Sequence, residues 1–383
     1  MLSPGVRKPL SRTVRFGVLG TYPPAQCGMA TFTSALTGAL SAQGSEVSIV
    51  RVADGSSTSD DTVIGELLNG SPQSSAACVE MLNQSQVAVI QHEDGLYGGA
   101  HGDELLAILG ALQVPSIVIA HGVSKNPAPH QRWVLERMAA TSDRMVVMSE
   151  AARERLCGEY GVDRKKVAMI PRGATLPTQP RLKRSSRPTI LTCGLLGPGK
   201  GIERVIDALP SLLNVPGRPC YHVVGRTHPE VLASQGESYR MGLVERARSN
   251  GVADSVSFDD RYFTTAALTA LMQTAAVIVL PYDSKDQVTS GVLVDAVASG
   301  RPVVATAFPH AVELLRDGAG IVVPHDDPEA LSSALRRVLT QPRLAGSMAA
   351  EARQLAPAMA WPVVADAYVT LAAGVRRERQ MRG

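Results

Sequence analysis

The sequence lacks the features of a secreted, disulfide-bonded or membrane-spanning protein. Its five cysteines are odd in number and far apart, and none forms a Cys-x-x-Cys pair, so neither a disulfide framework nor a zinc site is supported. No apolar run approaches the length needed to cross a bilayer, and the N-terminal stretch MLSPGVRKPLSRTVRF lacks the apolar middle of a signal peptide. We therefore expect a reduced, cytoplasmic protein.

The chain also lacks a large excess of either charge. It has 38 basic and 35 acidic residues, for a formal net charge of +3, so bulk electrostatics do not indicate a nucleic-acid partner. Both ends are locally basic, and residues 1–13 are expected to form a flexible tail. Basic ends favour at most a weak peripheral contact with the inner face of a membrane, and solvated tails are the commoner explanation. The basic residues concerned are Arg7, Lys8, Arg12 and Arg15, and Arg376, Arg377, Arg379 and Arg382.

Length and periodicity predict two α/β domains. At 383 residues the chain is too long for one ordinary core. Short Val- and Ile-rich runs alternate with amphipathic stretches, as in VRFGVLG, EVSIVRVA, QVAVIQH, PSIVIAHG, RMVVMS and VAMIPRG, and later TILTCG, YHVVG, AAVIVLPY, RPVVAT and GIVVP. This pattern is typical of doubly wound parallel sheets with helices on both faces.

A Pro- and Ser-rich stretch, ATLPTQPRLKRSSRP at residues 174–188, interrupts this alternation. It predicts a linker between a first domain over 14–180 and a second over 187–358. Helices are expected near 201–214, near 236–250 and after Ser290. The final segment carries an apolar helical stripe, Trp361, Val364, Ala365 and Tyr368. That stripe would close the second domain or return to the first, and the residues alone do not decide between these.

In the first domain, polar or flexible positions follow three predicted strands. A strand ends at Gly20, and Gly28 opens a helix after two prolines; the glycine would let a ligand approach the first N–H groups, or would serve only a tight turn. His92 and His121 follow two further strands and are expected to project from their carboxyl ends. A lone histidine is usually structural, but two at equivalent positions favour function.

In the second domain, CGLLGPGKGIE places Lys200 in a glycine-rich loop between a strand and a helix. This is neither a P-loop nor a dinucleotide fingerprint, and a lysine cation there suits a pyrophosphate leaving group. A second helix start, DQVTSGVLVD, has small residues at 289–291. Unpaired N–H groups and the positive end of the helix dipole make such a start suitable for a phosphate.

Together, Gly28, GKG at 199–201, the small-residue helix start and ASGRPVVAT resemble the retaining glycosyltransferases of the GT-B fold. That large family includes bacterial mannosyltransferases and glycogen and sucrose synthases, and the resemblance covers residues 14–375. It implies two Rossmann-like domains facing a cleft, an acceptor-side N-terminal domain joined by the C-terminal helix 359–383, and a donor domain at 187–358. TYPPAQCGMATFT, QHEDGLYGG and PYDSKDQVTSGVL also resemble a bacterial subgroup of sugar transferases.

The resemblance also implies roles for individual residues. Catalytic roles fall to His121, Lys200 and Gln287. Contacts with the nucleotide base or with the sugar are assigned to His92, Arg261 and Tyr262. The donor would be bound by Gly28, Lys200, Arg226, Thr289, Ser290, Gly291, Val292 and Asp295. No metal or cofactor is expected, because the chain has no Asp-x-Asp and neutralises phosphate with cations and dipoles.

Two positions depart from the family pattern. The usual Glu-x7-Glu pair is replaced by Gln287 and Asp295, and a neutral amide should stabilise a cationic transition state less than a carboxylate does. Asp283 or Asp286 is a candidate to compensate for it. Leu195 stands where many relatives carry an arginine, which leaves Arg226 or Arg172 as candidate substitutes.

The sequence therefore predicts retaining, metal-independent transfer of a hexose from a nucleotide-diphosphate sugar to a carbohydrate or lipid-linked acceptor. The absence of an evident nucleophile favours same-face displacement, in which the leaving phosphate accepts the proton. Two alternatives stay open. A catalytically silent nucleotide-sugar binder would explain Gln287 and Leu195, and a nucleotide-sugar epimerase would share the architecture. Base, hexose and acceptor cannot be read, because a few side chains and variable loops decide them.

Overall fold

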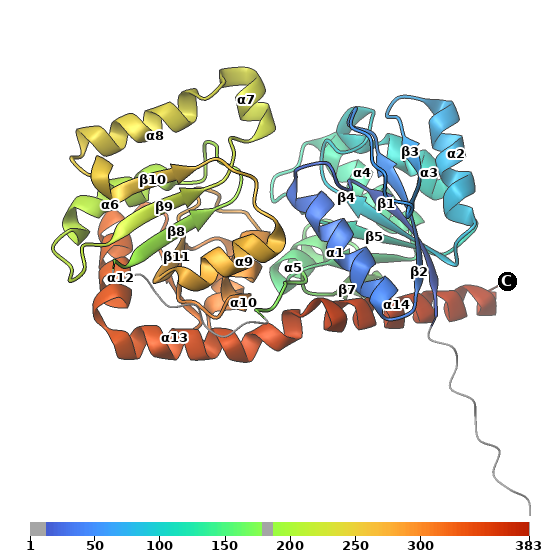
Figure 1. The fold of residues 1–383 in the computed structure, drawn as a ribbon. Helices are drawn as coiled ribbons and strands as arrows, with labels where there is room; N and C mark the ends of the chain where they lie inside the picture. The colour runs from blue at the N-terminus through green and yellow to red at the C-terminus, as the bar shows by residue number, and fades with distance from the viewer. Residues whose placement is uncertain (1–12, 178–186, 383) are drawn as a thin grey trace, which may run out of the picture. The chain divides into compact units, whose positions relative to one another are not determined.

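The computed structural model describes residues 13–177 and 187–382, and these divide into two compact units. The first unit contains the described residues up to Gly173 together with those from Trp361 onward, and the second begins at Ala174 and ends at Ala360. Figure 1 traces both along the chain. The basic tail predicted over 1–13 and much of the linker predicted over 174–188 lie outside the described residues.

The first unit is built on a seven-stranded sheet in the order β3-β2-β1-β4-β5-β6-β7, and every neighbouring pair is parallel. Its strands are β1 (Arg15–Gly20), β2 (Glu46–Val52), β3 (Val63–Leu67), β4 (Val87–His92), β5 (Ser116–Ala120), β6 (Arg144–Val147) and β7 (Val167–Met169). Its helices are α1 (Gly28–Ala42), α2 (Pro72–Asn83), α3 (Glu104–Ala111), α4 (Pro129–Thr141), α5 (Glu150–Gly158) and α14 (Trp361–Arg382), with short 3-10 turns η1 (Ala100–Gly102) and η2 (Arg164–Lys166).

The second unit has a six-stranded parallel sheet in the order β10-β9-β8-β11-β12-β13. Its strands are β8 (Thr189–Cys193), β9 (Cys220–Val224), β10 (Val256–Asp259), β11 (Val277–Leu280), β12 (Val303–Thr306) and β13 (Gly320–Val323). Its helices are α6 (Ile202–Leu212), α7 (Pro229–Gln235), α8 (Ser238–Ser249), α9 (Thr265–Thr274), α10 (Gly291–Ala298), α11 (Pro309–Leu315), α12 (Pro328–Thr340) and α13 (Pro342–Leu355), with η3 (Ala253–Ser255) and η4 (Ala356–Met359).

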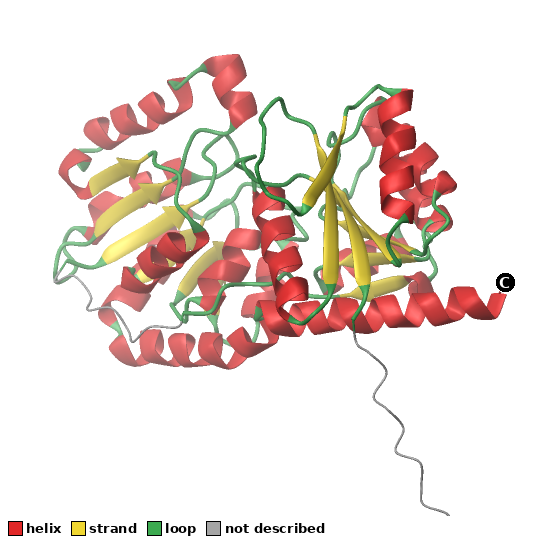
Figure 2. Ribbon diagram, turned by 45° about the vertical axis from the view of Figure 1, so that its right-hand side comes forward, coloured by secondary structure: helices red, strands yellow, loops and turns green. Residues whose placement is uncertain are grey.

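Burial of both sheet faces explains the apolar runs. Every residue of β4, β5 and β11 is buried, and Figure 2 shows helices on both faces of the strands. In the second unit one core lies under α10 and α11, and the other lies under α6, α8 and α12. The two doubly wound units predicted from the sequence are thus confirmed.

Most predicted elements match the structure, and one strand was missed. The helix expected near 201–214 is α6 and the one near 236–250 is α8. Strand β3 pairs only with β2, at the edge of the sheet, and its side chains alternate between exposed and partly buried positions. An edge strand needs no continuous apolar run, so the apolar pattern used to predict the other strands does not mark β3.

The helix α14 packs on the first unit, which settles the point that the apolar stripe left open. Val364, Ala365 and Tyr368 are buried in one cluster with Phe32, Leu36 and Leu40 of α1. The Trp361 ring lies edge-to-face against Phe32, with ring centroids 5.4 Å apart. The stripe therefore fixes the end of the chain to α1, beside which it lies in Figure 1.

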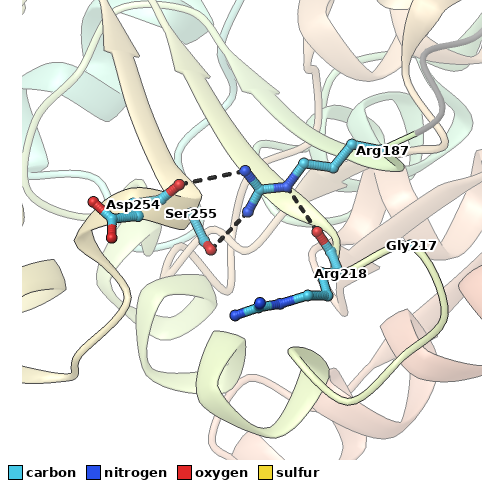
Figure 3. A pocket seen from close by; sticks show the side chains of 5 residues that line it. All are labelled: Arg187, Gly217, Arg218, Asp254 and Ser255. Atoms are coloured by element: carbon cyan, nitrogen blue, oxygen red, sulfur yellow. Dashed lines mark hydrogen bonds between the residues drawn. The ribbon is translucent and has the colours of Figure 1, made fainter.

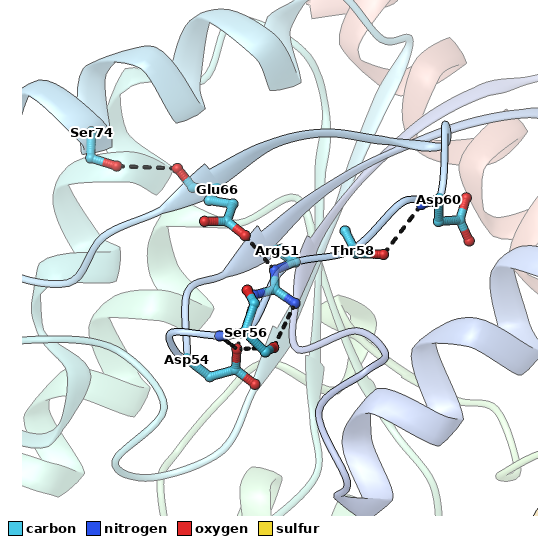
Figure 4. Close-up of polar contacts among 7 residues, drawn as sticks. All are labelled: Arg51, Asp54, Ser56, Thr58, Asp60, Glu66 and Ser74. Carbon is cyan, nitrogen blue, oxygen red and sulfur yellow. Dashed lines mark hydrogen bonds and ion pairs between the residues drawn. The ribbon is translucent and has the colours of Figure 1, made fainter.

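An ion cluster centred on the buried Arg51 of β2 joins the loop after β2 to strand β3 (Figure 4). The Arg51 side chain is 1% exposed and donates hydrogen bonds to Glu66 at 2.6 Å and Asp54 at 2.9 Å. Because a buried guanidinium without partners would be costly, this arginine is fully committed to structure.

A substitution at Gly173 tests the docking of α14. A Cβ on Gly173 would lie 2.2 Å from a ring atom of Trp361, and overpacking of this kind typically costs about 1–3 kcal/mol. We expect Gly173→Ala to unfold at lower urea concentration, as followed by tryptophan fluorescence. The matched control is Gly374→Ala inside α14, where a Cβ meets nothing within 4 Å and should stabilise by about 0.5–1 kcal/mol. Equal midpoints for Gly173→Ala and the parent chain would contradict this packing.

Candidate functional site

The sheet of the second unit reverses its order between β8 and β11. From β8 the chain moves outward to β9 and β10, whereas β11, β12 and β13 extend to the other side. At such a switch point the loops leaving neighbouring strands diverge and leave a crevice at the carboxyl ends. Lys200 follows β8, and the helix start at 289–292 follows β11, so topology brings the two predicted phosphate-binding features to one edge.

The glycine-rich loop after β8 is locked to the loop after β11 by close backbone approach. Gly201 has φ 64°, and a Cβ on it would lie 1.8 Å from the Pro281 carbonyl oxygen. The Asp283 N–H donates to the Gly199 carbonyl at 2.9 Å. Only glycine fits at 201, so the position of Lys200 is fixed by backbone contacts on both of its sides.

Lys200 is partly buried and has no acidic partner among the described residues. Its Nζ lies 4.8 Å from the centroid of the Tyr282 ring, and burial lowers the pKa of its ammonium group. The ion pairs of residues 13–177 and 187–382 include none to Lys200. The neighbouring Asp283, a candidate to compensate for Gln287, instead accepts from Arg204 at 2.8 Å. Within the described residues, the Lys200 ammonium on the loop after β8 therefore has no acidic counter-ion.

The start of α10 is more occupied than the sequence suggested. The Ser290 hydroxyl caps the helix by accepting from the Leu293 N–H at 3.3 Å. The Ser290 N–H donates to Nδ1 of His310 at 2.9 Å. His310, at the start of α11, is a buried residue that the sequence analysis missed. The Thr289 hydroxyl is buried without a hydrogen-bond partner among the described residues, so it is available to a bound oxygen.

Gln287 is used as a clip across the turn before α10. Its side-chain amide donates to the Thr289 carbonyl at 3.0 Å, and its own carbonyl accepts from the His310 N–H at 3.3 Å. Asp295 lies half-buried one turn into α10, and its charge adds to the effect of burial in raising the pKa of Cys193 to about 12. Val292 contacts the start of the loop after β8, since its methyl lies 3.4 Å from a Cβ built on Gly194.

The remaining predicted donor residues lie on loops farther along the same edge. The Arg226 side chain is exposed after β9, and its carbonyl accepts from the Leu196 N–H at 2.7 Å. Arg261 is exposed and pairs with Asp259 at 2.6 Å, which holds the pKa of that carboxyl down at about 2. Tyr262 is 51% exposed. Arg261 and Tyr262 follow β10, which β9 separates from β8 and from the loop of Lys200.

In the first unit the two predicted histidines are adjacent. The His121 N–H donates to the His92 carbonyl at 2.9 Å, and the His121 ring lies edge-to-face to Phe32 at 5.0 Å and against Gln91. Burial, Arg172 and His92 lower the pKa of His121 to about 3, and burial lowers that of His92 to about 4. Both imidazoles are therefore neutral hydrogen-bonding groups near pH 7. Arg172, a candidate diphosphate contact, lies close enough to His121 for its charge to lower the pKa of that ring.

Gly28 and Glu93 complete the carboxyl edge of the first unit. A Cβ on Gly28 would meet nothing within 4 Å, so packing of the unit does not require glycine at the start of α1. The carboxyl of Glu93, which the sequence analysis passed over, follows His92 directly. Burial and Asp94 raise the pKa of Glu93 to about 7. Its only sequence signal was its place after a buried strand.

A further hollow lies at the other end of the second unit's strands. Its volume is about 630 Å³, and it is lined by Arg187, Gly217, Arg218, Asp254 and Ser255, which precede β8, β9 and β10 (Figure 3). Arg187 donates to the Arg218 carbonyl at 2.7 Å and to the Ser255 hydroxyl at 2.7 Å. The side chain of Arg187 in this hollow is thus used to connect the loops before β9 and β10. Among the described residues there is no acidic, His or Cys cluster fit for a metal, and no helix long and apolar enough to cross a membrane.

Two doubly wound parallel units with a cationic switch-point site define a glycosyltransferase of the GT-B fold. A glycosyltransferase from Rickettsia africae superposes with a TM-score of 0.73 at 15% identity, covering 94% of this chain and 98% of that one. The sucrose-phosphate synthase of Thermosynechococcus elongatus gives 0.72 at 18% identity, covering 94% and 99%. These likenesses establish the fold.

The chain is a glycosyltransferase, and each of its two halves matches a glycosyltransferase family. Residues 187–341 match the family described as "Glycosyl transferases group 1", and residues 27–176 match "Glycosyltransferase Family 4". A GDP-mannose-dependent alpha-(1-6)-phosphatidylinositol monomannoside mannosyltransferase from Mycolicibacterium smegmatis is 27% identical over 71% of this chain and 72% of its own length. A phosphatidyl-myo-inositol mannosyltransferase from Mycobacterium leprae is 31% identical over 58% and 56%. The chain is thus a glycosyltransferase by both family matches.

The neutral state of His121 can be tested by titration. The pKa of His121 is lower in the folded chain than in the unfolded chain, so the unfolded chain binds the proton first as pH falls. The folded state therefore keeps its full stability above pH 6.5 and loses stability as pH falls from 6.5 toward the folded pKa. We expect the His121 ring signal in NMR spectra to stay at its neutral position from pH 8 to pH 5. In His121→Gln the loss of stability below pH 6.5 should be shallower by up to about 1 kcal/mol per pH unit. A His121 midpoint near 6.5 would contradict this.

Proposed function

We propose that the protein transfers a hexose from a nucleotide-diphosphate sugar to a carbohydrate or lipid-linked acceptor, with retention at the anomeric carbon and without a metal ion. The observation that carries the proposal is the partly buried Lys200 ammonium at the switch point, fixed by Gly201 and lacking a protein counter-ion among the described residues. A desolvated cation is stabilised by a bound anion, and a diphosphate is the anion that a nucleotide sugar brings.

The diphosphate would be received by groups of both loops. Lys200 supplies the charge, the Thr289 hydroxyl supplies a hydrogen bond that no described residue uses, and the dipole of α10 adds a partial positive charge. The Ser290 N–H is already engaged by His310, so its part is to hold the turn. Asp295 on α10 is assigned to the ribose hydroxyls, which a carboxylate can bind through two acceptor oxygens.

Retention is proposed to follow from same-face displacement. The acceptor hydroxyl oxygen bonds to the anomeric carbon as the bond from that carbon to the diphosphate oxygen breaks, and the acceptor proton passes to the departing phosphate oxygen. Negative charge develops on the diphosphate, where Lys200 lies, so this cation stabilises the transition state more than the ground state. His121, with its pKa near 3, would contact the sugar as a neutral hydrogen-bonding group.

The donor-site assignment is tested by Lys200→Ala. We expect calorimetric titration with GDP-mannose, UDP-glucose, ADP-glucose and the free diphosphates, in the presence of EDTA, to show tight binding of one nucleotide series. Lys200→Ala should weaken that binding at least tenfold and reduce transfer further. The matched control is Lys285→Ala on the next loop, since Lys285 is 66% exposed and pairs with Asp326. Full transfer by Lys200→Ala, inversion in the product, or dependence on added metal would each overturn the corresponding part of the proposal.

The role of Gln287 is tested by restoring the family's carboxylate. The Gln287 amide donates to the Thr289 carbonyl at 3.0 Å. A glutamate at this position would place a carboxylate oxygen against the Thr289 carbonyl oxygen, and the repulsion between them would loosen the turn before α10. We expect Gln287→Glu to weaken nucleotide binding severalfold and not to raise kcat. Gln287→Ala should weaken binding less, since it removes the clip without adding repulsion. A faster Gln287→Glu enzyme would show that the side chain serves the sugar and not the turn.

A further inference from the structure

The first unit contains a small polar cavity whose wall holds none of the residues assigned to the diphosphate. It lies between the end of β4, the loop after β5 and the helix α4, and has a volume of about 40 Å³. Its wall includes His92, Glu93, Asp94, His101, Gly122 and Gln131. All of these belong to one unit, so the cavity exists independently of the Lys200 site.

Two polar groups of this wall lack partners. The His92 side chain is 7% exposed, and its Nδ1 has no hydrogen-bond partner among the described residues. The half-buried Glu93 carboxyl takes part in none of the ion pairs or side-chain hydrogen bonds found in residues 13–177 and 187–382. Buried polar groups are nearly always satisfied in folded proteins, so this pair points to a missing ligand.

The other polar groups around the cavity are occupied by one another. Asp94 binds His101 at 3.3 Å through one oxygen and the Gln131 amide at 2.9 Å through the other. His101 is held in a left-handed conformation, with φ 54°. The Tyr160 hydroxyl donates to the Ser124 carbonyl at 2.7 Å. The surroundings therefore form a built frame around His92 and Glu93.

Size and charge select the ligand group. A volume of about 40 Å³ has room for a small polar group such as an ammonium or a hydroxyl. A neutral imidazole with its proton on Nε2 offers Nδ1 as an acceptor, and a carboxylate offers only acceptors. The cavity therefore suits a ligand group that donates hydrogen bonds. The carboxyl groups of Glu93 and Asp94 favour a cation over an anion.

We propose that this cavity binds a primary ammonium group of the acceptor, held by Glu93 and His92, so that the acceptor is an amine-bearing sugar or cyclitol and not a substrate presenting phosphate here. Identifying the ligand as the acceptor rests on the proposed glycosyl transfer. The cavity itself rests only on the geometry of the first unit. Burial and Asp94 raise the pKa of Glu93 to about 7, and a bound ammonium would favour the ionised carboxylate.

The test uses three sugars that differ only at carbon 6: 6-amino-6-deoxy-D-glucose, D-glucose and D-glucose 6-phosphate. Each is titrated into the full chain at pH 7.5, and the His92 ring signal is followed by NMR. We expect the amine to bind at least tenfold more tightly than glucose, and the phosphate to leave the signal unchanged. Equal affinities, tighter binding of the phosphate, or no saturable shift with the amine up to its solubility limit would overturn the proposal.

Variants assign the binding to the cavity. Glu93→Gln keeps the shape and removes the charge, and it should lower the amine affinity at least tenfold. In Gly122→Ala the new Cβ would lie 3.0 Å from Oε1 of Glu93, so it should crowd the cavity and weaken binding even if Glu93→Gln folds poorly. The control is Glu136→Gln, since Glu136 lies on α4 and pairs with Arg132 at 2.7 Å outside the cavity. Unchanged affinity in both cavity variants would overturn the assignment.

Nucleotide titration of the same samples separates the two hypotheses. We expect Glu93→Gln to leave nucleotide affinity unchanged, because the predicted diphosphate site belongs to the second unit. Amine binding without any nucleotide binding would refute the proposed donor function and leave the cavity assignment standing. Nucleotide binding without amine binding would refute the cavity assignment and leave the proposed donor function standing.

Discussion

The rest of the structure depends on the burial of both faces of two parallel sheets. Once β4, β5 and β11 are covered on both sides, their polar chemistry can be placed only at strand ends. Parallel connections then gather the loops that follow the strands at one edge. Gly28, His92 and His121 share that edge in the first unit, and Lys200 and the start of α10 share it in the second.

Desolvation separates the structural charges from the functional ones. Arg51 is almost completely buried, but Glu66 and Asp54 satisfy it, so its charge stabilises the loop after β2. Lys200 and Glu93 are partly buried and have no counter-ion among the described residues, and their pKa values shift toward the neutral form. Such uncompensated groups cost stability unless a ligand supplies the missing charge, which is why the two sites are argued from them.

Sequence reasoning selected the loops of the candidate site, but it could not identify the bonds that each residue makes. It gave Gln287 a catalytic role and Ser290 a donor contact, and in the structure Gln287 clips the turn while the Ser290 N–H donates to His310. His310 lies twenty residues beyond Ser290 in the chain, and no local pattern links them. Likewise, Asp283 was a candidate to assist Gln287, and in the structure it accepts a hydrogen bond from Arg204 of α6.

The sequence by itself determined the doubly wound architecture, the helix starts and the glycine loops, because periodicity and backbone freedom are local properties of the chain. It also identified the apolar stripe from Trp361 to Tyr368. Only the tertiary structure decided that this stripe packs on α1, that Pro281 excludes any side chain at Gly201, and that Glu93 and His92 border one small cavity. These outcomes depend on burial and on contacts between residues far apart in the sequence, which no single segment encodes.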